Sequence, residues 1–152
     1  MFNNVLIVCH ANVCRSPAAE RLFRAQAGHA ARAARSPRTP AFHSAGIRAM
    51  EGGGMDPVME RLLAERGIAA GAHHARRLTR RLVRDADLVL VTERRQVKDV
   101  EALEPTSRGK VYALGQWEDS DVIDPHGRDE AAYRDSFALI EHLVKGWLDK
   151  IC

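Results

Sequence analysis

The chain has 152 residues, of which 45% are hydrophobic and 28% are charged, and its formal net charge is +3. These proportions are ordinary for a globular domain and argue against a disordered or membrane-spanning chain, so the length predicts one domain over residues 1–152. The three cysteines are too few for a disulfide framework, and no leader-like basic and apolar stretch precedes the first apolar segment. We therefore expect a cytoplasmic protein that does not insert into membranes and keeps its thiols reduced.

The first elements surround the most informative segment of the chain. Val5–Val8 is apolar and β-branched, which predicts a buried parallel strand, and Ser16–Ala27 predicts a helix because a hydroxyl cap and a proline open it. The loop between them holds Cys9 and Arg15. Loop amides and a helix N-terminus that converge on one point bind anions, and the same dipoles favour a cysteine thiolate. The loop therefore predicts phosphoryl transfer to Cys9.

The rest of the chain alternates between expected strands and helices. Gly28–Pro40 is expected to be an exposed connection with an irregular helical start. After it, we expect a strand at Ala41–Ala45, a glycine-rich loop at Gly46–Gly54, a helix from Asp56 to Gly67, a helical turn at Leu78–Val83, a strand at Ala86–Val91, a helix at Glu93–Leu103, a strand at Val111–Leu114 and a helix at Glu130–Lys150. The last helix has an apolar face made of Tyr133, Phe137, Ile140, Leu143, Val144 and Trp147. This alternation predicts an open parallel α/β sheet, in which ligands bind at the carboxyl ends of the strands.

Phosphoryl transfer needs supporting groups around the nucleophile. The planar fork of arginine holds two phosphoryl oxygens, which predicts that Arg15 clamps the phosphate. Ser16 has two candidate roles, a hydrogen bond to the Cys9 sulfur or the cap of the following helix. Asn12 is expected to pin the loop by hydrogen bonds rather than to take part in the chemistry.

A phosphatase also needs a general acid to protonate the leaving oxygen, and the loop itself offers none. The candidate is Asp124, whose backbone is made rigid by Pro125. Asp119 and Asp121 lie nearby in the sequence and compete for the same role. Spacing alone places Asp124 only slightly ahead of them.

Arginines gather in two segments, Arg32–Arg38 and Arg76–Arg84. An acidic partner and a solvated, arginine-rich surface are the two interpretations, and we favour the second. Neither segment contains aromatic residues or a recognition element, which argues against nucleic-acid binding. The seven histidines have no ligand-like spacing, so we expect neither a metal nor another cofactor.

The segment from Val8 to Glu20 resembles the signature of the low-molecular-weight protein tyrosine phosphatases, and Asp124 stands in the place of that family's acid. The resemblance extends over nearly the whole chain and is greatest with the bacterial branch associated with exopolysaccharide and capsule export. It implies a four-stranded parallel sheet with helices on both faces, of the phosphatase I type. It also implies a phosphotyrosine protein substrate, namely the C-terminal tyrosine cluster of an autophosphorylating tyrosine kinase, and a monomer or weak dimer.

The same resemblance implies roles for individual residues. Cys9 would be the nucleophile, Arg15 the phosphate clamp and Asp124 the general acid and then base, without a metal. The substrate would contact His10, Ala11, Asn12, Val13, Cys14, Ser16, Met50 and His126, supported by Ser44 and His73. For His73, a capping or surface role is an equal alternative.

Three positions depart from the family pattern. Ala11 replaces a glycine, which predicts strain at a backbone position that favours positive φ. His126 replaces a tyrosine that would stack on the substrate ring. Met50 occupies the place of a bulky residue on the opposite wall, and its adaptable side chain predicts loose selectivity there.

Other functions remain open at this point. Arsenate reductases with this loop pass oxidation to further mid-chain cysteines, but no cysteine lies between Cys14 and Cys152. Phosphoarginine phosphatases favour threonine where this chain has Val13, and an apolar residue suits an aryl substrate better. A non-catalytic phosphotyrosine- or anion-binding module is the third alternative. Cys14 either forms a reversible disulfide with Cys9 or is an ordinary small buried residue.

Overall fold

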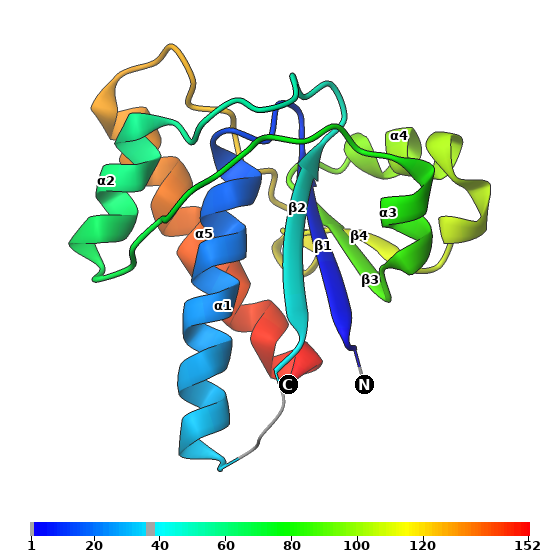
Figure 1. Cartoon of the computed structure of the whole chain (residues 1–152), viewed down its shortest axis with the longest axis horizontal. Coiled ribbons are helices and arrows are strands. Elements are labelled where there is room, and N and C mark those ends of the chain that lie inside the picture. The colour runs from blue at the N-terminus through cyan, green and yellow to red at the C-terminus, as the bar shows by residue number, and fades with distance from the viewer. Residues whose placement is uncertain (1, 36–38) are drawn as a thin grey trace.

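The chain folds around a four-stranded sheet (Figure 1), and the computed structural model describes residues 2–35 and 39–152. All neighbouring strands are parallel, and their spatial order is β2-β1-β3-β4. The strands are β1 (Asn4–Cys9), β2 (Ala41–Gly46), β3 (Leu88–Val91) and β4 (Val111–Ala113). The predicted parallel α/β fold is confirmed, and the strand that leads into the Cys9 loop lies inside the sheet.

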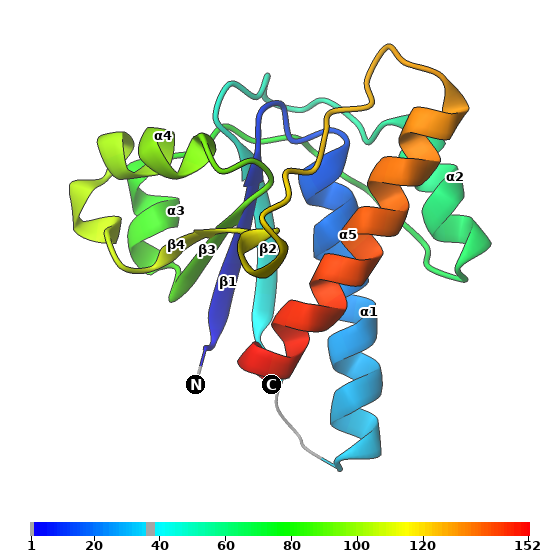
Figure 2. The same cartoon turned by 180° about the vertical axis from the view of Figure 1, so that it is seen from behind.

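Helices cover both faces of this sheet. Figure 2 shows α1, α2 and α5 on one side of the strands and α3 and α4 on the other. The helices are α1 (Arg15–Ala33), α2 (Pro57–Glu65), α3 (Arg80–Asp85), α4 (Gln96–Leu103) and α5 (Glu130–Ile151), with short 3-10 helices at Pro105–Ser107 and Gln116–Glu118. None of the helices in residues 2–35 and 39–152 combines the length and the apolar character that a bilayer crossing requires.

The side chains of strand β1 show why helices are needed on both faces of the sheet. Successive side chains of a strand point to opposite faces of the sheet. In β1, Val5 and Ile7 are buried in the cluster that includes α1, α2 and α5, whereas Leu6 and Val8 are buried in the cluster that includes α3 and α4. A strand that is apolar on both faces is typical of a parallel sheet between two helical layers.

The apolar face predicted for α5 is confirmed. All six of its expected core residues are buried: Tyr133, Phe137, Ile140, Leu143, Val144 and Trp147. Trp147 also satisfies its polar atom, because its Nε1 donates a 2.7 Å hydrogen bond to the carbonyl of Leu114. This bond fixes the lower part of α5 to the segment that follows β4.

Helix α1 differs from the prediction at both ends. It begins at Arg15 with Cys14 as N-cap residue, so Ser16 is not the capping residue. It also continues through Gly28 to Ala33, where we expected an exposed connection. The alanines that follow Gly28 are strong helix formers and outweigh the cost of one glycine, about 1 kcal/mol. Of the first arginine-rich segment, residues 36–38 lie outside the described residues.

Helices α3 and α4 begin later in the sequence than predicted. Helix α3 begins at Arg80 because the hydroxyl of Thr79 accepts the amide of Leu82 and caps the helix there. Helix α4 begins at Gln96, not at Glu93, because the Gln96 side chain accepts the Glu93 amide at 2.9 Å and holds that segment in a turn. Both shifts come from local side-chain bonds.

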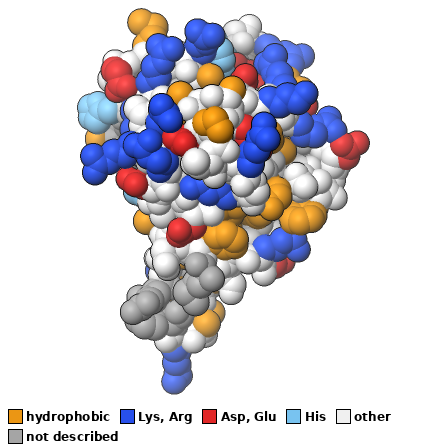
Figure 3. Space-filling model, turned by 90° about the vertical axis from the view of Figure 1, so that its right-hand side faces the viewer, with side chains coloured by type: hydrophobic (Ala, Val, Ile, Leu, Met, Phe, Trp, Pro, Cys, Tyr) orange, Lys and Arg blue, Asp and Glu red, His pale blue; other side chains and the backbone are white. Residues whose placement is uncertain are grey.

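Basic side chains are unevenly distributed over the surface. Figure 3 shows the side of the molecule that carries α3 and α4, where Lys and Arg gather over the upper part and acidic side chains are fewer. The upper part in this view is the end of the sheet at which the strands terminate. The basic side chains therefore extend towards the edge where a parallel sheet binds its ligand.

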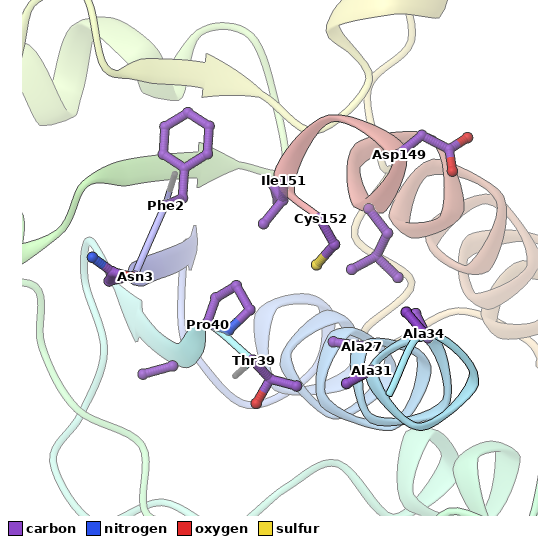
Figure 4. A pocket seen from close by; sticks show the side chains of 13 residues that line it. Phe2, Asn3, Ala27, Ala31, Ala34, Thr39, Pro40, Asp149, Ile151 and Cys152 are labelled. Atoms are coloured by element: carbon purple, nitrogen blue, oxygen red, sulfur yellow. The ribbon is translucent and has the colours of Figure 1, made fainter. Parts of the chain in front are cut away.

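A cavity of about 720 Å³ lies at the opposite end of the sheet, where strands β1 and β2 begin. Figure 4 shows Phe2, beside the start of β1, near Ile151 and Cys152 at the end of α5, with Ala27 and Ala31 of α1 on the other side. The lining is largely apolar and lies beside the amino ends of β1 and β2. This cavity is therefore not the site that the sequence predicts.

Gly46 allows β2 to approach the Cys9 loop closely. Its amide donates to the carbonyl of Arg76 and its carbonyl accepts the amide of Leu78. A Cβ atom at this position would lie 2.7 Å from the carbonyl oxygen of His10 and 2.8 Å from the amide nitrogen of Asn12. No side chain fits there without moving backbone.

We expect Gly46→Ala to lower the midpoint of thermal unfolding. Overpacking against backbone costs about 1–3 kcal/mol, which corresponds to roughly 2–12 °C in a domain of this size. Circular dichroism at increasing temperature measures the shift. Gly54→Ala is the matched control, because an added methyl there meets no atom within 4 Å. Equal shifts in the two variants would contradict the close approach of Gly46 to the loop.

Candidate active site

The loop from Cys9 to Arg15 lies at the carboxyl edge of the sheet, between β1 and α1. The chain that leaves β2 borders it on one side, since the amide of Ile47 donates to the carbonyl of Cys9 at 3.0 Å. The chain that leaves β3 borders it on the other, since the amide of Thr92 donates to the carbonyl of Val8. Three strand ends thus frame the loop, as the sequence predicts for a ligand site in a parallel sheet.

The sulfur of Cys9 is almost fully buried and receives directed hydrogen bonds. The Ser16 hydroxyl lies 2.8 Å from Sγ, and the Asn12 amide donates to Sγ at 3.3 Å. Ser16 Oγ already accepts a bond from Asn12 Nδ2 at 2.9 Å, so its own proton is free to point at the sulfur. These donors and the N-terminus of α1 all favour negative charge on Sγ.

Asn12 is the hydrogen-bonding hub of the loop. Its φ is +59°, in the left-handed region, whereas Ala11 is not among the described residues with positive φ. The expectation of a strained Ala11 is therefore wrong, because the left-handed position is filled by asparagine, which adopts it more readily than alanine does. The Asn12 side chain donates to Ser16 and Ser44 at 2.9 Å each and accepts the amide of Arg76 at 3.0 Å.

A buried carboxylate continues this network away from the loop. Ser44 Oγ accepts from Asn12 and donates to Glu20 at 2.5 Å. Glu20 is balanced by Arg24 at 2.7 Å and by Arg21 at 3.4 Å. The sequence predicts a supporting role for Ser44 but none for Glu20. The feature of the sequence that could have indicated this role is the position of Glu20 one helical turn after Ser16.

His73 joins the network through the backbone of Asn12. Its Nε2 lies 2.7 Å from the Asn12 carbonyl oxygen and its Nδ1 lies 3.2 Å from Arg21 Nη1. Arginine only donates hydrogen bonds, so Nδ1 accepts and Nε2 carries the proton that it donates to Asn12. Burial, opposed by the bond to Asn12 and helped by the Arg21 charge, lowers the pKa of His73 below its ordinary value. His73 is therefore a neutral part of the loop's support.

Arg21 is a positioning residue whose role the local sequence pattern does not reveal. Besides His73, its guanidinium donates to the carbonyls of Ala70 at 3.1 Å and Ala72 at 3.4 Å. The side chain is buried, with 7% of the residue exposed. One arginine of α1 thus holds the segment that carries His73 against the helix.

Arg15 is buried and anchored at one nitrogen. Its Nη1 donates to Glu93 at 2.6 Å and to the carbonyl of Val122 at 2.9 Å. Its Nη2 lies 3.8 Å from an Asp124 oxygen. Glu93, directly after β3, is a second residue whose role the sequence did not reveal. The only feature of the sequence that points to Glu93 is the position of an acidic residue at the carboxyl end of a buried strand.

The structure separates Asp124 from its two competitors. Asp119 and Asp121 both pair with Arg94. Asp124 is about half exposed beside Arg15, and one of its oxygens accepts the amide of His126 at 3.1 Å. Of the three carboxylates, Asp124 is the one with a recorded contact to the guanidinium of the loop.

A further carboxylate, Asp56, supports the loop from below. Its side chain caps α2 and accepts the Tyr133 hydroxyl at 2.7 Å, while its amide donates to the carbonyl of Val13. Burial and the bond to Asp56 raise the pKa of Tyr133 to about 12. His126, with Nδ1 3.6 Å from Asp56, lies at the rim above this group. Asp56 is thus the N-cap residue of the helix that the sequence predicts to begin there.

The remaining expected substrate contacts divide into rim and interior. Met50 is 83% exposed, His126 is 72% exposed at its side chain, and His10 is also exposed. Val13 is half-buried. Ile123, 57% exposed and adjacent to Asp124, adds an apolar rim residue that the sequence analysis did not name. The rim therefore offers apolar surface next to the polar loop.

Cys14 lies in the interior as a free thiol, as does Cys9. Burial and the nearby Asp56 raise the pKa of Cys14 far above its ordinary value, so this thiol is neutral. Cys152 lines the cavity at the other end of the sheet. Across residues 2–35 and 39–152, no group of histidine, cysteine and acidic side chains is arranged to hold a metal ion.

The sequence and the fold are both similar to those of known proteins. The chain is 34% identical over 148 residues to the low molecular weight protein-tyrosine-phosphatase Wzb of Escherichia coli, covering 97% of this chain and 94% of that protein. The crystal structure of the Erwinia amylovora tyrosine phosphatase AmsI is 32% identical, with a TM-score of 0.87 over 99% of this chain and 94% of AmsI. The YwlE arginine phosphatase from Geobacillus stearothermophilus is 27% identical, with a TM-score of 0.85 over 97% of this chain and 91% of that structure.

The family of this chain is also shown by a match to a family model, which does not depend on any single relative. Residues 4–152 match the model described as low molecular weight phosphotyrosine protein phosphatase. The match spans the loop, the Arg15 anchor and Asp124 together. The chain belongs to the low molecular weight protein-tyrosine-phosphatases, and its resemblance to their exopolysaccharide-associated bacterial branch is confirmed.

Proposed function

We propose that this tyrosine phosphatase works through a cysteinyl-phosphate formed on Cys9, with Arg15 as phosphate clamp and Asp124 as general acid and base. The observation that carries this proposal is the convergence of the three groups at one strand edge. Cys9 Sγ receives the Asn12 amide at 3.3 Å, and the free end of the Arg15 guanidinium lies 3.8 Å from Asp124. A nucleophile, an anion clamp and a proton donor thus surround the N-terminus of α1.

In the first step the Cys9 thiolate attacks phosphorus. Its electron pair forms the S–P bond while the bond between phosphorus and the tyrosine oxygen breaks, and Asp124 gives its proton to that oxygen. Glu93 and Val122 already hold one nitrogen of Arg15, so the guanidinium does not need to reorganise as charge moves over the phosphoryl oxygens. The loop amides bind the same oxygens.

In the second step water replaces the sulfur. Asp124, now ionised, takes a proton from the attacking water as the new P–O bond forms. The S–P bond breaks and its electrons return to Cys9 as a thiolate. The Ser16 hydroxyl, 2.8 Å from Sγ, stabilises the departing sulfur.

The substrate we propose is a phosphotyrosine protein, the C-terminal tyrosine cluster of a bacterial tyrosine kinase in exopolysaccharide export, dephosphorylated in the cytoplasm. Similarity to Wzb and AmsI supports it. Val13 and Ile123 add apolar surface at the loop, which suits an aryl ring. We also propose a monomer or weak dimer that needs no cofactor.

Two other reactions are less well supported. An arsenate reductase would need a relay cysteine near the loop, but Cys152 lines the cavity at the opposite edge of the sheet. Phosphoarginine is the second candidate because the fold of an arginine phosphatase is as similar as that of tyrosine phosphatases. Comparing rates on phosphotyrosine and phosphoarginine peptides distinguishes them, and we expect the phosphotyrosine peptide to be hydrolysed faster.

We expect Cys9→Ser to abolish turnover of both p-nitrophenyl phosphate and a phosphotyrosine peptide, since the S–P bond cannot form. Asp124→Asn should lower kcat by roughly 10²–10⁴-fold on the peptide, whose leaving oxygen needs a proton, and by less on p-nitrophenyl phosphate. Steady-state rates measure both effects. Asp119→Asn is the matched control, because Asp119 pairs with Arg94, and it should retain wild-type rates. Equal losses from the two aspartate variants would contradict the assignment of the acid.

We expect Arg21→Met to raise the pKa of His73 towards its ordinary value of 6.5, because a neighbouring cation and part of the burial are removed. His73 also faces Glu20, which favours its charged form, and His74, which opposes it. NMR titration of the ring protons measures the change. Because the loop loses part of its support, Arg21→Met should also lower kcat roughly 10- to 100-fold, with a smaller effect on KM.

Arg24→Met is the control for this variant. Arg24 pairs with Glu20 but makes no recorded contact with His73. It should leave the His73 titration unchanged. If Arg21→Met also leaves the titration and kcat unchanged, Arg21 has no positioning role.

A further inference from the structure

The net positive charge of the chain is confined to one segment. Residues 76–110 contain ten arginines and lysines against six acidic residues, whereas the rest of the chain contains thirteen against fourteen. This segment includes α3, β3 and α4, the side of the molecule on which Figure 3 shows the gathered basic side chains. The surface over α3 and α4 is therefore the part of the molecule with an excess of basic side chains.

On the side of Asp124, most of the charged groups neutralise one another. Asp119 and Asp121 pair with Arg94, and Glu118 contacts His142. Glu130 pairs with Arg61 and Arg134. These ion pairs leave little uncompensated negative charge to repel a phosphorylated peptide.

On the other side, two exposed arginines adjoin the loop. The amide of Arg48 donates to the carbonyl of His10, the residue after Cys9, at 2.8 Å. Arg77 forms a β-bridge with Gly46, whose α-carbon approaches the loop backbone directly. Both backbones are therefore fixed beside the loop while both side chains are exposed.

These two arginines differ from the arginines of α3 in lacking a carboxylate partner. Arg80 and Arg84 share Glu104, and Arg81 pairs with Asp85. Within residues 2–35 and 39–152, the side chains of Arg48 and Arg77 have no carboxylate at ion-pair distance. The nearby Glu51 accepts the backbone amide of Arg77 at 2.8 Å.

The phosphoryl group itself does not explain these charges. Arg15 is the buried clamp at the loop, held by its own bonds to Glu93 and Val122. Two further exposed cations at the rim attract a second negative group, outside the catalytic loop. Residues of an extended peptide follow one another at about 3.3–3.6 Å, so such a group lies within a few residues of the phosphotyrosine.

We propose that Arg48 and Arg77 form a docking rim for acidic side chains that flank the phosphotyrosine of the substrate peptide. This inference rests on the proposed function and specifies its substrate class. Attraction between exposed charges is modest for each pair and weakens as salt rises. The rim therefore selects among phosphotyrosine sites and speeds their encounter rather than supplying the chemistry.

The test compares kcat/KM for three phosphotyrosine peptides whose flanking residues are Glu, Ser or Lys, with p-nitrophenyl phosphate as a substrate that carries no flanks. At low ionic strength the wild type should prefer the Glu peptide to the Lys peptide by roughly 5- to 30-fold, and high salt should reduce this ratio. The variant R48Q/R77Q should lose most of the preference. The control R108Q/K145Q removes two exposed cations remote from the loop and should retain both the ratio and the rate on p-nitrophenyl phosphate.

The outcomes separate this inference from the proposed function. No turnover of p-nitrophenyl phosphate or of any peptide would refute the proposed function. Turnover of all substrates with no dependence on flank charge, or equal loss of preference in both double variants, would overturn the docking rim alone. Binding to vesicles of anionic lipid that R48Q/R77Q abolishes, without any peptide preference, would overturn it in favour of a membrane surface.

Discussion

The left-handed backbone of Asn12 is the constraint on which the catalytic loop depends. This conformation costs about 1–2 kcal/mol for a residue with a side chain and persists only where the surroundings fix it. Here the amide of Asn12 bonds the Cys9 sulfur and its carbonyl bonds His73, while its side chain bonds the start of α1, the end of β2 and the amide of Arg76. The start of α1 and two segments distant in sequence thus fix one residue, and that residue aims the loop amide at the sulfur.

The buried charged side chains around the loop are likewise held in place by several contacts each. An uncompensated guanidinium in the interior would cost several kcal/mol, but Arg15 has Glu93 and a carbonyl as partners on one nitrogen. Glu20 is compensated in the same way by two arginines. These pairs add little net stability, since burial opposes them, but they leave each group in one orientation. The site is therefore rigid before a substrate arrives, and the anion meets donors already in place.

The sequence predicted those parts of the molecule that local pattern determines. Cys9 and Arg15 lie within one short loop between a strand and a helix, and the apolar face of α5 follows helical spacing. Glu93 and Arg21 escaped notice because their roles depend on contacts between elements far apart in the chain. Asp124 is distinguished from Asp119 and Asp121 by a tertiary contact that spacing does not show, because Arg94 pairs with both of them. The length of α1 was mispredicted because one glycine was given more weight than the alanines around it.

Asp56 links the loop to a helix synthesised much later. It caps α2, bonds the carbonyl of Val13 through its amide and accepts the hydroxyl of Tyr133 from α5. While the chain is being translated, the Cys9 segment emerges long before Tyr133, Val122 and Asp124. A nascent chain at that stage contains Cys9 and Arg15 but lacks Val122, which accepts a hydrogen bond from Arg15, and Asp124. The bonds that orient Arg15 and Asp56 therefore form only after most of the chain has been synthesised.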